Sequence, residues 1–363
     1  MNQSPRKTIA FFLGTFEDWG GASRALLNFV RGIDRARYRP LVVLTREGTL
    51  SAQLDTEGID WAIWENRDSS KNVLGYAWYV FRAYRFLLKQ GIDLIHMNCG
   101  ATGWKPVEIP AARLAGVPII SHMHITVDKP SPFVRHSSAI IAVSEYIARH
   151  SHTFGLPTYA IHNISHLERF ACGHDIREEL GYGPEHVLTV FMGQMIRQKG
   201  IEMLIEAFCK VPNQNARLLL AGGIRATEGA YTEDEVRALV TRDPRIRYLG
   251  FRTDAENLYR TADIMVMPSQ WEEPCAMILF EAAAAGRPLI ATATGGTPEI
   301  LRNGETGFLI DRTDTQALTQ HLQRLIDDPV LRGEMGHRAA QVARDEYAHG
   351  PIEKVQHLYD SLL

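Results

Sequence analysis

The feature that most constrains the fold is an alternation of short apolar runs with segments of helical spacing. Each run is brief, rich in β-branched residues and ended by glycine or polar residues, as is typical of a buried strand. In the first half these runs are "KTIAFFLG" (7–14), "RPLVVLTREG" (39–48), "DLIHMN" (93–98), "GVPIISHMH" (116–124) and the start of "SAIIAVSEYIARHSH" (138–152). Strands separated by helices predict a parallel sheet covered on both faces.

The same alternation restarts near residue 186, so we expect two α/β domains of similar layout. The second series of strands comprises "HVLTVFMGQM" (186–195), "ARLLLAGG" (216–223), "RIRYLGF", "ADIMVMPS", "RPLIATAT" and "TGFLID". A polar, glycine-containing stretch over 165–185 marks the join. The predicted domains are therefore 1–167 and 168–346, and from Asp314 onward the sequence predicts charged helices without strands.

Composition excludes several classes of protein. No apolar run reaches the roughly 18–20 residues that span a bilayer, and the polar N-terminus lacks the pattern of a secretory signal. The four cysteines are far apart and the 14 histidines show no metal-ligand spacing, which indicates reduced thiols and no metal site. The net charge of −3 divides into +5 over 1–172 and −8 over 173–363. This asymmetry suggests different partners for the two halves, but it is too small to indicate nucleic acid.

Segment 71–90, "KNVLGYAWYVFRAYRFLLKQ", combines aromatic residues with Arg82, Arg85 and Lys89. One interpretation is an amphipathic helix that lies on a membrane surface. The other is a crossover helix whose aromatic side chains lie in the core. The need for a crossover between parallel strands favours the second interpretation.

Two glycine pairs, Gly20-Gly21 and Gly295-Gly296, follow strands and open helices. Paired glycines let the backbone approach a ligand closely, and a helix N-terminus favours an anion. The first pair lacks the spacing of the dinucleotide and P-loop fingerprints, so a plain tight turn is an equal alternative.

Two cations, Arg197 and Lys199, stand between a strand and a helix in "GQMIRQKGIEMLIEAF" (193–208). At the carboxyl end of a parallel strand such side chains point to the place where ligands bind. Lysine suits a phosphate as a point charge, and arginine suits a bidentate contact. The alternative is that both are solvated loop cations.

The stretch "PSQWEEPCAMILFEAAAAG" (268–286) follows another predicted strand. Pro274 fits the first turn of a helix that would run to Ala285 and end at Gly286. The free N–H groups at its start, those of Cys275, Ala276, Met277 and Ile278, would favour negative charge.

Two acids flank this apolar helix. Glu273 comes just before it and Glu281 lies two predicted turns inside, on a similar face about 10 Å along the axis. A buried carboxylate needs a hydrogen-bond partner, and ligand hydroxyls are one source. The alternative is an acid that answers the helix dipole together with a solvated glutamate. The spacing favours Glu273 over Glu272 as the ligand-facing acid and leaves Glu272 in solvent.

Taken in order, these segments resemble the family-4 retaining glycosyltransferases of the GT-B fold (glycosyl transferases group 1). The resemblance covers nearly the whole chain, and the order and spacing of its motifs make it specific. Its marks are the Gly20-Gly21 loop, "PIISHMH" ending in His124, "IIAVSEYI", "GQMIRQKG", "LYRTADIMVMPSQWEEP", the pair Glu273 and Glu281, and "GGTPEI…NGETGFLI".

The resemblance implies a GT-B fold, in which two Rossmann-like α/β/α domains with parallel sheets face a deep cleft. The acceptor would bind domain 1–167 and the nucleotide-sugar donor domain 168–346, and a crossover helix at 347–363 would return to the first domain. The implied catalytic residues are His124, Glu273 and Lys199. The implied donor-binding residues are Gly20, Gly21, Gln194, Arg197, Lys199, Pro274, Cys275, Ala276, Met277, Ile278 and Glu281.

Within that set the resemblance assigns distinct roles. Lys199 would grip the diphosphate, with backbone N–H groups from Gly21 and from the helix after Pro274. Glu281 would hold the ribose hydroxyls and Glu273 hydroxyls of the donor sugar. His124 matches a histidine that approaches the transferred sugar.

Three positions depart from the family pattern. Gln194 stands where an arginine is usual, which removes a charge-assisted phosphate contact worth roughly 1.5–3 kcal/mol; Arg197 is the candidate to compensate. "NISH" (163–166) replaces an "NGVD"-like turn, and Ala276 replaces a frequent glycine.

The resemblance implies a retaining transfer of a sugar from a UDP- or GDP-sugar to a cytosol-facing glycan or lipid-linked acceptor, without a metal cofactor. Bacterial surface polysaccharide or glycolipid assembly is the expected setting, in the cytoplasm or peripherally on the cytoplasmic face of the inner membrane. The basic first half makes the N-terminal domain the candidate for membrane contact. The alternatives are a nucleotide-sugar 2-epimerase of the same fold and a non-catalytic nucleotide-sugar-binding module.

Overall fold

The computed structural model describes residues 6–13, 21–65, 73–99, 106–163 and 166–363. Contacts between residues divide the chain into two units. Unit 1 comprises Met1–Ile164 with His349–Leu363, and unit 2 comprises Ser165–Ala348. Within the described residues no helix is long and apolar enough to cross a membrane.

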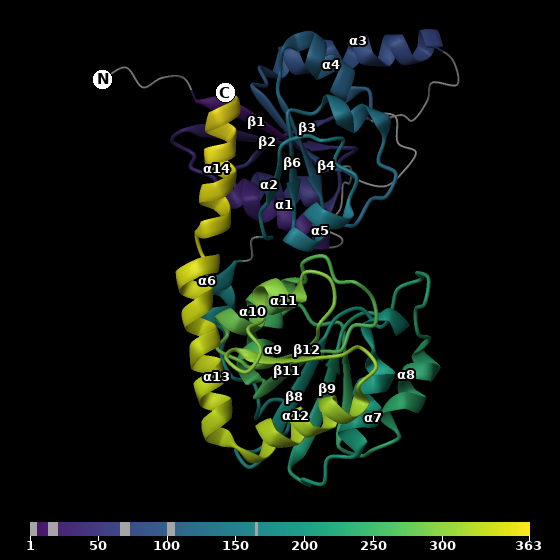
Figure 1. The fold of residues 1–363 in the computed structure, drawn as a ribbon, viewed down its shortest axis with the longest axis vertical. Helices are drawn as coiled ribbons and strands as arrows, with labels where there is room; N and C mark the ends of the chain where they lie inside the picture. The colour runs from purple at the N-terminus through teal and green to yellow at the C-terminus, as the bar shows by residue number, and fades with distance from the viewer. Residues whose placement is uncertain (1–5, 14–20, 66–72, 100–105, 164–165) are drawn as a thin grey trace. The chain divides into compact units, whose positions relative to one another are not determined.

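Unit 1 contains a parallel sheet whose described strands follow the order β3-β2-β1-β4-β5-β6-β7 (Figure 1). The central strands β1 and β4 pair side by side, so the strand order reverses between them. The strands are β1 (Lys7–Phe12), β2 (Tyr38–Leu44), β3 (Asp60–Ile63), β4 (Leu94–Cys99), β5 (Ile119–Met123), β6 (Ala139–Ala142) and β7 (Thr158–Ala160). The helices are α1 (Gly21–Gly32), α2 (Thr49–Thr56), α3 (Val73–Gln90), α4 (Glu108–Ala115), η1 (Pro132–His136), α5 (Glu145–His150) and α14 (Gly350–Leu362).

Unit 2 contains a second parallel sheet, with the described strands in the order β10-β9-β8-β11-β12-β13. Here the order reverses between β8 and β11, which pair directly. The strands are β8 (Val187–Met192), β9 (Ala216–Ala221), β10 (Ile246–Gly250), β11 (Ile264–Met267), β12 (Leu289–Thr292) and β13 (Gly307–Ile310). The helices are α6 (Leu167–Ala171), η2 (Arg197–Lys199), α7 (Ile201–Cys209), α8 (Glu233–Val240), α9 (Ala255–Thr261), α10 (Met277–Ala284), α11 (Thr297–Ile300), α12 (Thr315–Asp327), α13 (Pro329–Val342) and η3 (Ala343–Tyr347).

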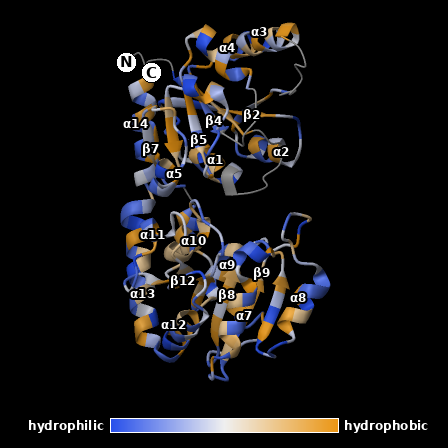
Figure 2. Ribbon diagram, turned by 45° about the vertical axis from the view of Figure 1, so that its right-hand side comes forward, coloured by the Kyte–Doolittle hydropathy of each residue, from blue (hydrophilic) through white to orange (hydrophobic). Residues whose placement is uncertain are grey.

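Both sheets carry the apolar strands that the sequence predicts, and Figure 2 shows hydrophobic residues along them. The strands β8 and β9 are buried along most of their length because helices cover both faces of the sheet. The prediction of two α/β domains with parallel sheets is therefore confirmed.

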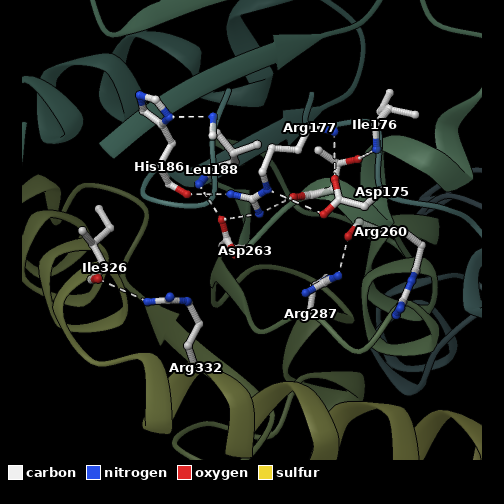
Figure 3. Close-up of polar contacts among 12 residues, drawn as sticks. Asp175, Ile176, Arg177, His186, Leu188, Arg260, Asp263, Arg287, Ile326 and Arg332 are labelled. Carbon is white, nitrogen blue, oxygen red and sulfur yellow. Dashed lines mark hydrogen bonds and ion pairs between the residues drawn. The ribbon is translucent and has the colours of Figure 1, made fainter. Parts of the chain in front are cut away.

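The segment before β8 is packed onto unit 2. The carboxylate of Asp263, just before β11, accepts the N–H of Leu188 on β8 at 2.7 Å and a guanidinium N–H of Arg177 at 3.1 Å (Figure 3). Arg177 also donates to the carbonyl of His186 at 2.6 Å. The polar stretch at the predicted join thus ties the amino ends of the two central strands together.

The last helix, α14, belongs to unit 1. Its Val355 and Tyr359 are fully buried in the core formed with β1 and α1. The backbone N–H of Asp34 donates to the Gln356 side chain at 2.6 Å. The segment 347–363 therefore divides at residue 349, where unit 1 resumes.

Helix α3 has two apolar faces. Val80, Ala83 and Leu87 are buried against the sheet, as expected of a crossover helix. Trp78 and Phe81, in contrast, are exposed. The interpretation that the aromatic residues of this helix lie in the core is therefore wrong for these two side chains.

Candidate functional site

The loops that follow β8, β11 and β12 come into close contact at the carboxyl edge of the unit 2 sheet. Gly200 has a φ of +71°, and a Cβ atom there would lie 1.9 Å from the carbonyl oxygen of Pro268. Gly295 has a φ of +55°, and a Cβ atom there would lie 2.1 Å from the carbonyl oxygen of Glu273. Only glycine permits both the left-handed backbone and these approaches. The three loops thus form one cluster at the switch point between β8 and β11, where α/β sheets bind ligands.

A buried carboxylate lies at the centre of this cluster. Glu273 is 3% exposed, and its Oε1 accepts a hydrogen bond from Lys199 Nζ at 2.5 Å. The hydroxyl of Ser269 donates to the same oxygen. Lys199 Nζ also lies 5.3 Å from the ring centroid of Trp271. A charged donor and a hydroxyl therefore compensate the burial of the Glu273 carboxylate.

Helix α10 begins later than the sequence predicts. Pro274 lies in the loop, Ala276 is the N-cap residue and Met277 is the first helical residue. The prediction that Pro274 occupies the first helical turn is wrong. The reason is tertiary: the carbonyl of Glu273 accepts the N–H of Gly296 at 2.8 Å, which holds this segment against the following loop.

The later start changes which backbone groups lie at the helix N-terminus. Of the four predicted donors, Met277 and Ile278 lie in the first turn of α10, whereas Cys275 and Ala276 precede it. The side chain of Cys275 is buried. The free N–H groups of this first turn still favour a negative charge at the same end of the cluster.

Glu281 is the fifth residue of α10 and is half-buried. Its Oε2 accepts a hydrogen bond from the Tyr259 hydroxyl at 2.6 Å. Burial, together with the adjacent Glu281 carboxylate, raises the pKa of Tyr259 well above its usual value. A tyrosine of α9 therefore supplies a partner that we expected from ligand hydroxyls.

Glu272 does not point freely into solvent, so that prediction is wrong. Its Oε2 accepts the backbone N–H of Gly295 at 2.7 Å, and its Oε1 pairs with Arg312. Because the side chain holds the turn at Gly295, it contributes to the arrangement of the loops around Glu273.

The two remaining side chains after β8 are exposed. Gln194 follows the strand directly, and Arg197 opens η2. The Arg197 guanidinium donates to Glu202 at 3.1 Å and to Glu235, and it lies 4.5 Å from the ring centroid of Tyr231. A phosphate would have to compete with two carboxylates for Arg197, so its compensation for Gln194 stays a prediction.

In unit 1, Gly21 is the first residue of α1, which follows β1, and Gly20 lies outside the described residues. His124 follows β5 directly and is 9% exposed. Its ring stacks near that of His122, with centroids 4.1 Å apart. Among the described residues neither ring nitrogen of His124 has a hydrogen-bond partner.

Behind His124 a chain of buried rings leads to the last helix. His122 Nδ1 lies 2.9 Å from His96 Nε2, and His96 Nδ1 lies 2.5 Å from the Tyr359 hydroxyl of α14. Burial lowers the pKa of both His96 and His124 to about 3 and the pKa of His122 well below its usual value. These three imidazoles are therefore neutral at physiological pH.

No group of three His, Cys, Asp or Glu side chains is arranged to hold a metal ion in the part of the chain that the structure describes. A reaction without a metal ion stays a prediction.

Two family models match the chain in sequence, one to each unit. "Glycosyltransferase Family 4" matches residues 19–169, and "Glycosyl transferases group 1" matches residues 186–328. The chain belongs to the family-4 glycosyltransferases. The resemblance inferred from the motifs is thereby confirmed.

Named relatives of this family-4 chain differ in what they glycosylate. A D-inositol 3-phosphate glycosyltransferase of Corynebacterium glutamicum is 34% identical over 49% of this chain and 45% of its own length. An N-acetyl-alpha-D-glucosaminyl L-malate synthase of Bacillus anthracis is 26% identical over 63% of this chain and 60% of its own length. The chain thus spans about half the length of the curated relatives it matches.

Solved structures with the same fold cover the family-4 chain almost completely. A glycosyltransferase from Rickettsia africae superposes with a TM-score of 0.86 at 19% identity, over 99% of both chains. The Anabaena protein HepE in complex with UDP superposes with a TM-score of 0.78 at 22% identity, over 98% of this chain and all of the other. These likenesses establish the GT-B fold.

The structure brings together some of the predicted residues and adds others. Lys199 and Glu273 meet directly, whereas Arg197 is engaged elsewhere and His124 lies in the other unit. Ser269 and Tyr259 were missed as individual residues. Both stand in "LYRTADIMVMPSQWEEP", so the motif contained them, but no spacing rule identifies their partners.

Proposed function

We propose that this family-4 chain is a retaining glycosyltransferase that moves a sugar from a UDP- or GDP-sugar to a glycan or lipid-linked acceptor. The observation that carries the proposal is the Lys199–Glu273 pair at the carboxyl edge of the unit 2 sheet. The names of the relatives, and the complex of the Anabaena protein HepE with UDP, support a nucleotide-sugar donor.

Lys199 is suited to the diphosphate of the donor. An ammonium group has three donors, so Lys199 can keep its hydrogen bond to Glu273 and offer the remaining N–H groups to a phosphate oxygen. The first-turn N–H groups of Met277 and Ile278 favour the same charge. As the bond to the sugar breaks, negative charge grows on the leaving diphosphate, and these fixed groups stabilise it. We therefore propose that no metal ion is required.

The two carboxylates have separate roles in the proposal. Glu281, oriented by Tyr259, holds the ribose hydroxyls. Glu273, fixed by Lys199 and Ser269, accepts hydrogen bonds from hydroxyls of the donor sugar through the lone pairs that remain. His124 approaches the transferred sugar as a neutral imidazole, which can donate or accept one hydrogen bond. Retention follows from attack on the face that the diphosphate leaves, with the leaving phosphate taking the proton of the acceptor.

The acceptor is proposed to face the cytosol, in surface-polysaccharide or glycolipid assembly. A capsular polysaccharide biosynthesis glycosyltransferase of Staphylococcus aureus, 27% identical over 48% of this chain, supports this setting. We place the protein in the cytoplasm, with peripheral contact between the basic unit 1 and the inner membrane.

A screen of UDP- and GDP-sugars for thermal stabilisation, followed by product analysis, tests the proposal. A binding donor raises the melting temperature, and transfer yields a glycosylated acceptor with the anomeric configuration of the donor. Release of free sugar without acceptor would instead indicate a 2-epimerase. Binding without turnover on any acceptor would indicate a non-catalytic module.

Two substitutions separate the proposed roles of the acids. Glu281→Ala should weaken the binding of the bare nucleoside diphosphate, because its ribose loses a hydrogen-bond acceptor. Glu273→Ala should mainly lower turnover, because the nucleotide does not contact it. An equal loss of nucleoside diphosphate affinity in both variants would contradict this division.

A further inference from the structure

Helix α3 presents a continuous apolar stripe on the side that does not pack against the sheet. Its members recur four and three residues apart and therefore lie along one face. They are Leu74, Trp78, Phe81 and Leu88, with Arg85 at the centre, and Leu74 and Trp78 are 84% and 58% exposed. An exposed apolar patch of this kind marks an interaction surface.

The charges beside this stripe have one sign. Arg82 and Lys89 flank it, Arg85 lies within it, and α3 contains no acidic residue. Among the described residues, neither Arg85 nor Lys89 forms an ion pair, while Arg82 lies over the ring of Tyr79 at 5.6 Å. The cations of this face are thus available to an anionic partner.

The orientation of α3 places the stripe parallel to the surface of unit 1. Val80, Ala83 and Leu87 hold the opposite face of the helix in the core. Helix α4 lies beside α3 and adds Leu114, whose side chain is 70% exposed (Figures 1 and 2). The stripe therefore faces outward along the helix.

We propose that the outer face of α3 is the surface by which this protein binds an anionic lipid membrane. A tryptophan and a phenylalanine beside basic side chains are typical of helices that lie in the membrane interface. Each lysine or arginine near an anionic surface strengthens binding about five-fold. This surface deepens the proposed membrane contact of unit 1, but it rests on α3 alone and not on sugar transfer.

A second copy of this chain is a poorer occupant of the face. A two-fold dimer would bring each stripe against itself. Because Arg85 sits in the middle of the stripe, the two copies would place like charges together in an apolar contact, which is unfavourable. An anionic lipid surface instead accepts the apolar side chains and neutralises the cations at once.

Vesicle flotation of the full chain, without donor or acceptor, tests the proposal. We expect binding to vesicles of phosphatidylcholine mixed with phosphatidylglycerol, much weaker binding to phosphatidylcholine alone, and weaker binding at high salt. The double variant Trp78→Ser/Phe81→Ser should lose more than about ten-fold in binding. The triple variant Arg82→Gln/Arg85→Gln/Lys89→Gln should bind anionic and neutral vesicles equally.

A matched control replaces two exposed apolar residues of unit 2, as Phe251→Ser/Val330→Ser, and should bind like the wild type. All the substituted side chains are exposed, so melting temperatures should stay unchanged. Equal binding by the Trp78/Phe81 variant and the control would overturn the proposal, as would absence of binding by the wild type. A wild-type dimer that the Trp78/Phe81 variant makes monomeric would also overturn it, in favour of an interface between copies. Each of these outcomes leaves the proposal of sugar transfer standing.

Discussion

Lys199 and Glu273, 74 residues apart in sequence, form an ion pair whose acidic partner is almost completely buried. Lys199 reaches it because η2 ends at Gly200, whose positive φ lets the backbone pass close to Pro268. The pair therefore depends on both loops, and it places a cation and an anion at one point of the sheet edge. This arrangement links the stability of unit 2 to its proposed chemistry.

Removal of the lysine should be more harmful than removal of both charges. Lys199→Met leaves Glu273 buried without its charged partner, at an expected cost of about 3 kcal/mol in the free energy of unfolding. In Lys199→Met/Glu273→Gln the neutral amide can still bond Ser269, so the loss should be smaller. Urea unfolding of the two single variants and the double variant measures this coupling. Additive losses would show that the pair does not interact.

Gly295→Ala should disrupt the cluster through the backbone. The added Cβ atom meets the Glu273 carbonyl at 2.1 Å, and φ is positive. We expect a loss of more than about 3 kcal/mol. Gly304→Ala is the control, because Gly304 has a φ of +78° but open space around it, so only the backbone strain of about 1 kcal/mol applies. Similar losses in the two variants would contradict the steric argument.

The central strands were predictable because each is a continuous apolar run between turn residues. The edge strands β3 and β7 were not, since Asp60–Ile63 is half exposed and Thr158–Ala160 has three residues with no buried position. Edge strands gain their structure from pairing with a neighbour rather than from a pattern of their own.

The site was predictable in its location but not in its contacts. The positions of Lys199 and Glu273 after strands place both at the carboxyl edge, as the order of elements implies. The late start of α10 and the role of Glu272 depend instead on hydrogen bonds with Gly295 and Gly296, which follow another strand. No local pattern contains such contacts, because they arise only when the sheet is assembled.

The same limit explains the two interpretations of α3. Its sequence contains apolar residues at nearly every angle around the helix, so periodicity alone does not identify the buried face. The structure shows that Val80, Ala83 and Leu87 are buried while Trp78 and Phe81 are exposed.

Tyr259→Phe should separate orientation of Glu281 from stability. Loss of the hydroxyl removes the hydrogen bond to Glu281 Oε2, and we expect a five- to ten-fold loss in nucleoside diphosphate affinity, equivalent to about 1–1.4 kcal/mol. Tyr347→Phe is the control, since that buried hydroxyl donates to the carbonyl of Ile300 instead. Calorimetric titration measures both affinities. If both variants bind like the wild type, Tyr259 does not position Glu281 for the nucleotide.

Unit 1 should lose stability in acid because of its three buried histidines. Their folded-state pKa values lie far below the ordinary value near 6.5, to about 3 for His96 and His124, so the unfolded chain takes up protons that the folded chain does not. The stability is fully present above pH 6.5 and falls as the pH drops from there toward 3. Between about pH 7.5 and pH 5.5 three such groups remove roughly 4 kcal/mol.

Tryptophan fluorescence during urea unfolding at the two pH values measures this loss. Five of the six tryptophans lie in residues 1–164, so the signal reports chiefly on unit 1. His122→Asn should reduce the pH dependence by about one third, because one of three equivalent protonation steps is removed. His150→Asn, which replaces an exposed histidine of the same unit, should leave it unchanged. If His122→Asn keeps the full pH dependence, the buried histidines are not the groups that unfold unit 1 in acid.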